Sequence, residues 1–258
     1  MKNKFLSLLI IFLINLSFTS ANAENEFNFN ITEIEILDDG NKIIGKNRGD
    51  ITSPNGLTIS ANSFEYDKIK NILNASGNVI IEDDLKSYKI FSEDIIYKKN
   101  EETIFAKGVA SAKIKSRYNL ETQDMLFSKN QNVIYSNYQT TIRDVQTKTL
   151  FNLKKFNMDI KDEVLKGEKV LVVSNYNLPQ NDKLFFENSM FDLKNSNFVA
   201  KDIEIQLKKN TFDNMDNDPR LKGVSLSKKN DITVINKGIF TSCKKDDDCP
   251  PWALSAKK

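Results

Sequence analysis

Apolar and polar residues alternate with a period of two along most of this chain. Asn, Asp, Gly and Lys interrupt the alternation about every ten residues, which is typical of short strands joined by turns. No window of a dozen residues after Ala23 has the periodicity of a helix. The pattern therefore predicts an all-β fold in which each strand has one apolar and one polar face.

A repeat about 31 residues long organises these strands. The run Leu57–Tyr66 returns as Tyr88–Tyr97, and a fainter copy covers Tyr118–Phe127. A second strand follows the first two copies, at Leu73–Ile81 and at Ile104–Ala112. Repetition at a fixed period indicates stacked supersecondary units, so we expect the chain to form an elongated stack of paired strands.

Within each copy the alternation slips by one residue. The slip falls on the polar pairs Asn62-Ser63, Glu93-Asp94 and Gln123-Asp124. After a one-residue slip, the apolar side chains would point to the other face of the sheet. Each slip therefore predicts a bulge or corner that turns them back to the interior face. Corners at the same place in successive copies fold a sheet over on itself. This predicts an open β-jelly roll or an elongated sandwich, apolar inside and polar outside.

The large apolar residues of the repeat are the predicted lining of an interior groove. They are Phe64, Tyr66, Val79, Ile81, Ile95, Tyr97, Met125 and Phe127. Small residues lie beside them, and these could leave room for something other than side chains: Ala75, Gly77, Ala106, Gly108, Ala110 and Ala112. The alternative interpretation is that both sets simply fill a tapering core.

The first 23 residues have the features of a secretory signal peptide. A charged start precedes an apolar run over Phe5–Phe18, and Ala21-Asn22-Ala23 is a small-x-small cleavage site. We expect cleavage between Ala23 and Glu24 and a mature chain outside the cytoplasm. The alternative is an uncleaved membrane anchor.

Composition excludes several classes of function. The chain has 37 basic and 35 acidic residues, and removing the signal peptide with Lys2 and Lys4 leaves the two balanced. No basic field is present to attract nucleic acid. The absence of histidine excludes triads and metal sites built on it. We predict no enzyme activity, no cofactor and no metal. In an oxidising compartment Cys243 and Cys249 are better suited to a disulfide than to metal binding.

Two stretches resemble a known family. Ala61–Asp67 followed by Leu73–Ile81 looks like the OstA-type repeat of lipopolysaccharide transport proteins. The resemblance covers about Leu57 to Ile114 and implies an open β-jelly roll that shields the acyl chains of lipid A. It also implies that an LptA-type periplasmic bridge protein pairs with an exposed edge strand. We expect Asn28–Leu37 to lie near that edge.

The C-terminal stretch narrows the resemblance. Gly238–Cys243 and Cys249–Ala256 are similar to the segment that joins the periplasmic domain of LptD-type members to their outer-membrane barrel. This implies a jelly roll over residues 24–236, a linker over 237–258, and a place on the periplasmic side of the outer membrane. An LptE-type lipoprotein partner is implied by the resemblance alone. The cysteines would either close a short local loop or bond to cysteines of a barrel, which this sequence lacks.

Other interpretations stay open from the sequence. An uncleaved signal would make the chain similar to the inner-membrane LptC type, and an incidental Cys-to-Trp pattern would make it similar to a free LptA-type bridge. A β-helix enzyme acting on polysaccharides would use acids such as Glu93-Asp94 or Asp246-Asp247-Asp248. These acids fall at corners and turns, where solvated charge is the ordinary explanation. An adhesin stalk is a further non-enzymatic alternative.

Overall fold

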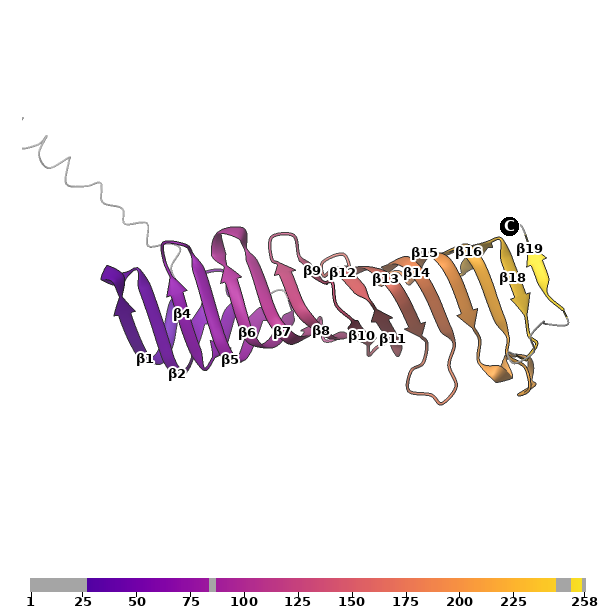
Figure 1. Ribbon diagram of the computed structural model, residues 1–258, viewed down its shortest axis with the longest axis horizontal. Coiled ribbons are helices and arrows are strands. Elements are labelled where there is room, and N and C mark those ends of the chain that lie inside the picture. The colour runs from indigo at the N-terminus through magenta and orange to yellow at the C-terminus, as the bar shows by residue number, and fades with distance from the viewer. Residues whose placement is uncertain (1–26, 84–86, 245–251, 257–258) are drawn as a thin grey trace, which may run out of the picture.

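The computed structural model describes residues 27–83, 87–244 and 252–256. It is an elongated stack of antiparallel strands, with β1 at one end and β19 at the other (Figure 1). The strands are β1 (Asn28–Leu37), β2 (Lys42–Thr52), β3 (Thr58–Ala61), β4 (Ser63–Asp67), β5 (Ile72–Asp83), β6 (Tyr88–Lys98), β7 (Thr103–Ile114), β8 (Tyr118–Ser128), β9 (Val133–Ser136), β10 (Thr140–Asp144), β11 (Thr149–Leu153), β12 (Lys155–Asp159), β13 (Val164–Val173), β14 (Lys183–Asp192), β15 (Asn197–Gln206), β16 (Arg220–Lys229), β17 (Ile232–Asn236), β18 (Gly238–Thr241) and β19 (Leu254–Ala256). Within these described ranges, no helix is long and apolar enough to cross a membrane.

One continuous sheet folds over into two facing layers. β2 pairs with β4 through its first half and with β3 through its second half, and the later long strands divide in the same way. We call the layer that contains β4 arm A and the layer that contains β3 arm B. The apolar faces of both arms point inward, so the fold is the elongated β-jelly roll that the alternation predicts.

Each arm carries a ladder of inward-facing residues that runs along the molecule. The inner row of arm A is Ile43, Tyr66, Leu73, Tyr97, Ile104, Phe127, Ile134, Met158, Leu165, Phe191 and Phe198. The inner row of arm B is Ile51, Ile59, Ile81, Ile90, Ala112, Leu120, Ile142, Phe151, Val172, Leu184, Ile205, Leu221 and Phe240. In each row, neighbouring residues belong to paired strands. The rows therefore define one interior that extends from β2 to β16.

The predicted corners are present. β3 ends at Ala61 and β4 begins at Ser63, so Asn62 separates the two arms. The pairing of β6 with β7 shifts register between Ser92 and Asp94. Asp124 has a φ of 46°, the left-handed backbone that a sharp corner requires. The polar pairs of the repeat thus mark where each strand passes from one arm to the other.

Two of the small residues have a different role from the one predicted. Gly77 and Gly108 were expected beside the lining, but both have positive φ, at 81° and 73°, and both lie at corners. A Cβ on Gly77 would come within 2.6 Å of the Asn62 side chain. Glycine is needed there for backbone geometry and close approach, not to leave interior space. The four alanines are buried at 1% exposure, as expected of interior positions.

The described residues contain seven two-strand units, of which the sequence repeat marks three. The units cover residues 28–52, 58–83, 88–114, 118–144, 149–173, 183–206 and 220–241. The last unit includes β18, and β19 pairs with β18, so strand pairing continues into the segment 237–258 predicted as a linker. The predicted signal peptide, its cleavage site at Ala23 and Glu24, and Cys249 lie outside the described residues.

Candidate functional site

The predicted groove residues all lie in the interior between the arms. Six of them are on arm A, and Val79 and Ile81 face them from arm B. Their exposed fractions range from 0% at Ile81 to 4% at Tyr66, so this part of the interior is closed. Their place inside the jelly roll agrees with the sequence pattern. Their contact with a lipid stays a prediction.

Aromatic contacts close the free ends of the arms over this region. The ring of Phe27, which precedes β1, lies edge-on to Tyr66 at 5.0 Å and to Tyr97 at 6.0 Å between centroids. Tyr88 of arm B meets Phe127 of arm A edge-on at 4.8 Å. These contacts are side-chain packing and not backbone pairing. Over this part of the described chain, side chains and not paired backbones therefore hold the free ends of the arms together.

The interior becomes exposed toward the C-terminal end. In the inner row of arm B, every residue from Ile51 to Ile142 is at most 1% exposed. Exposure rises to 4% at Phe151 and 7% at Val172, and Leu184, Ile205 and Leu221 are only partly buried. The closed core thus turns into an open apolar trough over β14–β16.

A small apolar cleft marks the start of this trough. It encloses about 200 Å³ between the arms, lined by Phe151, Val172 and Leu184 of arm B and by Phe191 and Phe198 of arm A. The rings of Phe151 and Phe191 are 5.1 Å apart and those of Phe191 and Phe198 are 5.3 Å apart. The volume is below the roughly 300–1,000 Å³ of pockets that enclose whole small ligands. It fits the end of a hydrocarbon chain whose remainder lies along the trough.

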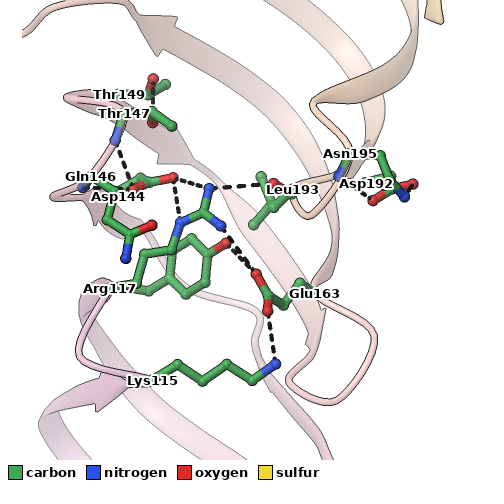
Figure 2. A network of polar contacts seen from close by, with 11 residues as sticks. Lys115, Arg117, Asp144, Gln146, Thr147, Thr149, Glu163, Asp192, Leu193 and Asn195 are labelled. Carbon is green, nitrogen blue, oxygen red and sulfur yellow. Dashed lines mark hydrogen bonds and ion pairs between the residues drawn. The ribbon is translucent and has the colours of Figure 1, made fainter. Parts of the chain in front are cut away.

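A cluster of polar side chains stands where the closed part ends, and Figure 2 shows it. We call Lys115, Arg117, Tyr118, Asp144 and Glu163 the polar latch. The first four lie at the free end of arm B, and Glu163 lies at the free end of arm A, between β12 and β13. Its contacts therefore join the two arms beside the cleft.

Glu163 is the centre of the latch. Its Oε2 accepts from Tyr118 Oη at 2.7 Å and from Arg117 Nη1 at 3.3 Å, and its Oε1 pairs with Lys115 Nζ at 2.8 Å. Arg117 Nη2 donates to Asp144 Oδ2 at 2.7 Å within arm B and to the carbonyl oxygen of Leu193 on arm A at 3.3 Å. Two basic and two acidic side chains balance each other, so the latch is held by fixed geometry and not by excess charge.

The latch shifts the pKa values of its members. Burial tends to raise the pKa of Glu163, but hydrogen bonds from Lys115 and Tyr118 and the nearby positive charges outweigh it, and the pKa is lowered. The pKa of Asp144 is also lowered, because hydrogen bonds from Arg117 and from the Thr147 and Gln146 N–H groups outweigh burial. Burial, and then the hydrogen bond to Glu163, raise the pKa of Tyr118. Both carboxyl groups are therefore ionised in the folded chain at neutral pH.

Neither the latch nor the cleft was predicted from the sequence. Arg117 and Glu163 are 46 positions apart and lie in turns, where a charged residue is ordinarily solvated. Only the strict strand alternation around them could have placed both turns at free ends of the arms.

Each end of the sheet offers a strand with an unpaired side. Among the described residues, β1 pairs only with β2, and its Ile34 and Ile36 are 42% and 64% exposed. The expectation that Asn28–Leu37 lies at an edge is confirmed. At the other end β17 pairs only with β16, while β19 covers β18. Backbone groups along β1 are free to pair with a further strand.

The C-terminal cysteine region is only partly described. Cys243 is 9% exposed, and its Sγ lies 3.8 Å from the carbonyl oxygen of Trp252. The same carbonyl accepts from Thr241 Oγ1 at 2.9 Å. Because Cys249 lies outside the described residues, the disulfide stays a prediction.

A further hollow lies on the outer face of arm A. It has a volume of about 970 Å³ and is lined by arm A alone. Most of its lining residues alternate with the inner row and so face outward, among them Tyr135, Lys166, Met190 and Val199. Met190 and Val199 are 44% and 47% exposed, so this is a wide, shallow surface. Its mixture of lysines and apolar side chains makes it a useful control surface for the interior.

No family model matches the chain, and no curated protein matches it. Among solved structures, the chain is similar to the crystal structure of LptH from Pseudomonas aeruginosa, described as the LptA-homologous periplasmic component of the lipopolysaccharide transport device. The two are 17% identical, with 43% of this chain and 81% of that chain covered and a TM-score of 0.37. At that TM-score the similarity alone assigns neither family nor function.

Proposed function

We propose that this chain carries lipopolysaccharide, with the acyl chains between arms A and B and the sugars in water. The observation that supports this most is the passage from a closed core to an open apolar trough along one continuous interior. Each methylene moved from water into such a trough is stabilised by roughly 0.8 kcal/mol. An amphiphile with several acyl chains therefore gains enough free energy from burying them to bind. Its sugars stay in water and need no enclosed site.

The cleft at Phe151 and Phe198 is where a chain would first enter. The acyl chain would then move into the closed region lined by Phe64, Tyr97 and Phe127, once the free ends of the arms separate. Separation breaks ring contacts and the polar latch but leaves the backbone pairing of the sheet intact. Acyl chains could thus move along the interior without unfolding the sheet.

We place the chain on the periplasmic side of the outer membrane, as an LptD-type component. The unpaired side of β1 would receive a strand of an LptA-type bridge protein by backbone pairing. The segment from Cys243 to Trp252 would lead toward an outer-membrane barrel that binds an LptE-type lipoprotein. Reading the gene downstream of Lys258 distinguishes this role from a free bridge. The mass of the mature N-terminus distinguishes it from an LptC-type anchored carrier.

Lipid binding by the purified full chain tests the proposal. Leu184→Asp places a charge in the open trough, and Val199→Asp places the same charge on the outer face of arm A as a matched control. We expect fluorescent lipid A to bind the wild type and the Val199 variant alike, and to bind the Leu184 variant at least tenfold more weakly. Equal loss in both variants, or no binding to the wild type, would contradict the proposal.

A further inference from the structure

The inner row of arm A continues into a lysine. Lys228 of β16 pairs with Phe198 of β15, the preceding member of that row. It lies two positions after the buried Leu226 on the same strand, and residues two apart on a strand point to the same face. The side chain of Lys228 therefore starts on the interior face, where every other member of the row is apolar or aromatic. The apolar pattern of the row is broken at this one position.

Lys228 also lines the apolar cleft at the start of the trough. The lining of the cleft contains Lys228 together with Phe151, Leu184 and Phe198. Cα partners on neighbouring antiparallel strands are about 5 Å apart, so Lys228 starts one strand away from Phe198. The lysine is half-buried there. Its charge thus belongs to the same cleft as the apolar side chains that would hold the end of an acyl chain.

The cleft has an apolar floor and a polar mouth. Its aromatic and aliphatic residues belong to the inner rows, whereas its hydroxyl and amide side chains lie in or beside the turns at the free ends of the arms. These polar residues are Thr147 and Thr149 on arm B and Ser196 and Asn197 on arm A. An amphiphile whose chain end fills the floor therefore has its head group at a polar mouth.

Of the four charged residues that line the cleft, three already have partners. Arg117 Nη2 and Asp144 Oδ2 pair with each other at 2.7 Å. Asp192 accepts from Asn195 twice, from the backbone N–H to Oδ1 at 3.0 Å and from Nδ2 to Oδ2 at 2.8 Å. The side chain of Lys228 makes no hydrogen bond or ion pair with any other residue that the structure describes. Its positive charge is therefore available to a ligand in the cleft.

We propose that the ammonium of Lys228 binds a phosphate group of the amphiphile whose acyl chain occupies the cleft. An ammonium offers three donors and a compact positive charge, which suits the oxygens of a phosphate. The attraction is stronger at a mouth partly closed to water than on an open surface. The inference rests on the proposed function and adds a head-group contact to it. This contact orients the lipid, with its phosphate on the β16 side of Phe198.

Two lipids and three variants of the full chain test this contact. The probes are bisphosphorylated lipid A and the same lipid A with its phosphates removed. Lys228→Gln removes the charge, and Lys228→Arg keeps it. Lys229→Gln is the matched control, because Lys229 is the next residue on β16, points to the opposite face and is exposed. Circular dichroism and thermal unfolding check that all three variants fold.

We expect the wild type, Lys228→Arg and Lys229→Gln to bind phosphorylated lipid A about tenfold more tightly than the dephosphorylated form. Lys228→Gln should lose most of this preference and keep its affinity for the dephosphorylated lipid.

Three results would overturn the contact and leave the proposed function standing. The first is binding of both lipids to the wild type without a preference. The second is an equal loss of affinity for both lipids in Lys228→Gln, which would indicate a purely structural role. The third is displacement of phosphorylated lipid A by inorganic phosphate below about 1 mM, which would assign Lys228 to a free anion. Failure of the wild type to bind either lipid would overturn both the contact and the proposed function.

Discussion

At the scale of single residues, Glu163 joins the two arms directly. It is 13% exposed and contacts three side chains of arm B: Lys115, Arg117 and Tyr118. Removing one member of such a cluster leaves donors without partners in a site partly closed to water. The contribution of Glu163 therefore comes less from Coulomb attraction than from the groups that depend on it.

Replacement of Glu163 by alanine tests this dependence. We expect Glu163→Ala to lower the free energy of unfolding by about 2 kcal/mol, since Arg117 and Tyr118 lose a shared acceptor. Glu121→Ala is the matched control, because Glu121 pairs with Arg143 on the surface and should change stability by less than about 0.5 kcal/mol. Urea unfolding followed by tryptophan fluorescence or circular dichroism measures both. Equal effects of the two substitutions would show that the latch does not hold the arms.

The lowered pKa values of Glu163 and Asp144 predict how stability depends on pH. A carboxyl group whose pKa is lower in the folded chain stabilises it above the unfolded pKa, and this stabilisation is lost as the pH falls through the folded pKa. The ordinary values are 4.5 for Glu163 and 3.8 for Asp144. We expect the unfolding free energy of the wild type to fall below about pH 4.5. Glu163→Gln should fall less steeply, and parallel curves would contradict the lowered pKa of Glu163.

At the scale of strands and loops, much of the fold could be predicted from the sequence. The range Asn28–Leu37 matches β1, and the three polar pairs mark real corners. These features depend on local alternation and on local backbone geometry, and both can be inferred from a single sequence. The later units were missed because their inner residues change identity and because loops 174–182 and 207–219 break the period. The pairing of successive strands continues there, but neither the residues nor the period of the repeat is kept.

The candidate site was harder to predict for the same reason. Phe64 and Ile81 could be assigned to the interior, but nothing local shows that they stand on opposite arms. The polar latch joins turns from different units. Its residues resemble ordinary surface charge until the folded sheet brings them together.

The edge strand β1 gives a prediction at this scale. Ile34 and Ile36 are exposed, so replacing both with lysine should change the free energy of unfolding by less than about 0.5 kcal/mol each. Lysine on an edge strand opposes pairing with a further strand. We therefore expect the double variant to lose binding to an LptA-type partner while it folds normally. Surface plasmon resonance measures the binding, and Ile69→Lys, at an exposed turn, is the control.

At the scale of the whole molecule, the chain combines a closed half and an open half within one sheet. The inner row of arm B is closed from Ile51 to Ile142 and opens by Leu184. The polar latch stands at the boundary, and the long loops 174–182 and 207–219 belong to the open half. The two halves share the same strand geometry, so the difference comes from how the free ends of the arms are held together. Weakening the latch should therefore extend the open half toward β8.

Photo-crosslinking to lipopolysaccharide tests the central claim most directly. A photoreactive phenylalanine analogue is placed at Leu184 and Phe198 in the trough, at Tyr97 in the closed half, and at Met190 and Lys68 on the surface. We predict strong crosslinks from Leu184 and Phe198, weaker ones from Tyr97 that increase in the Glu163→Ala background, and none from Met190 or Lys68. Crosslinks from the surface positions alone, with none from the trough, would contradict an interior that carries acyl chains.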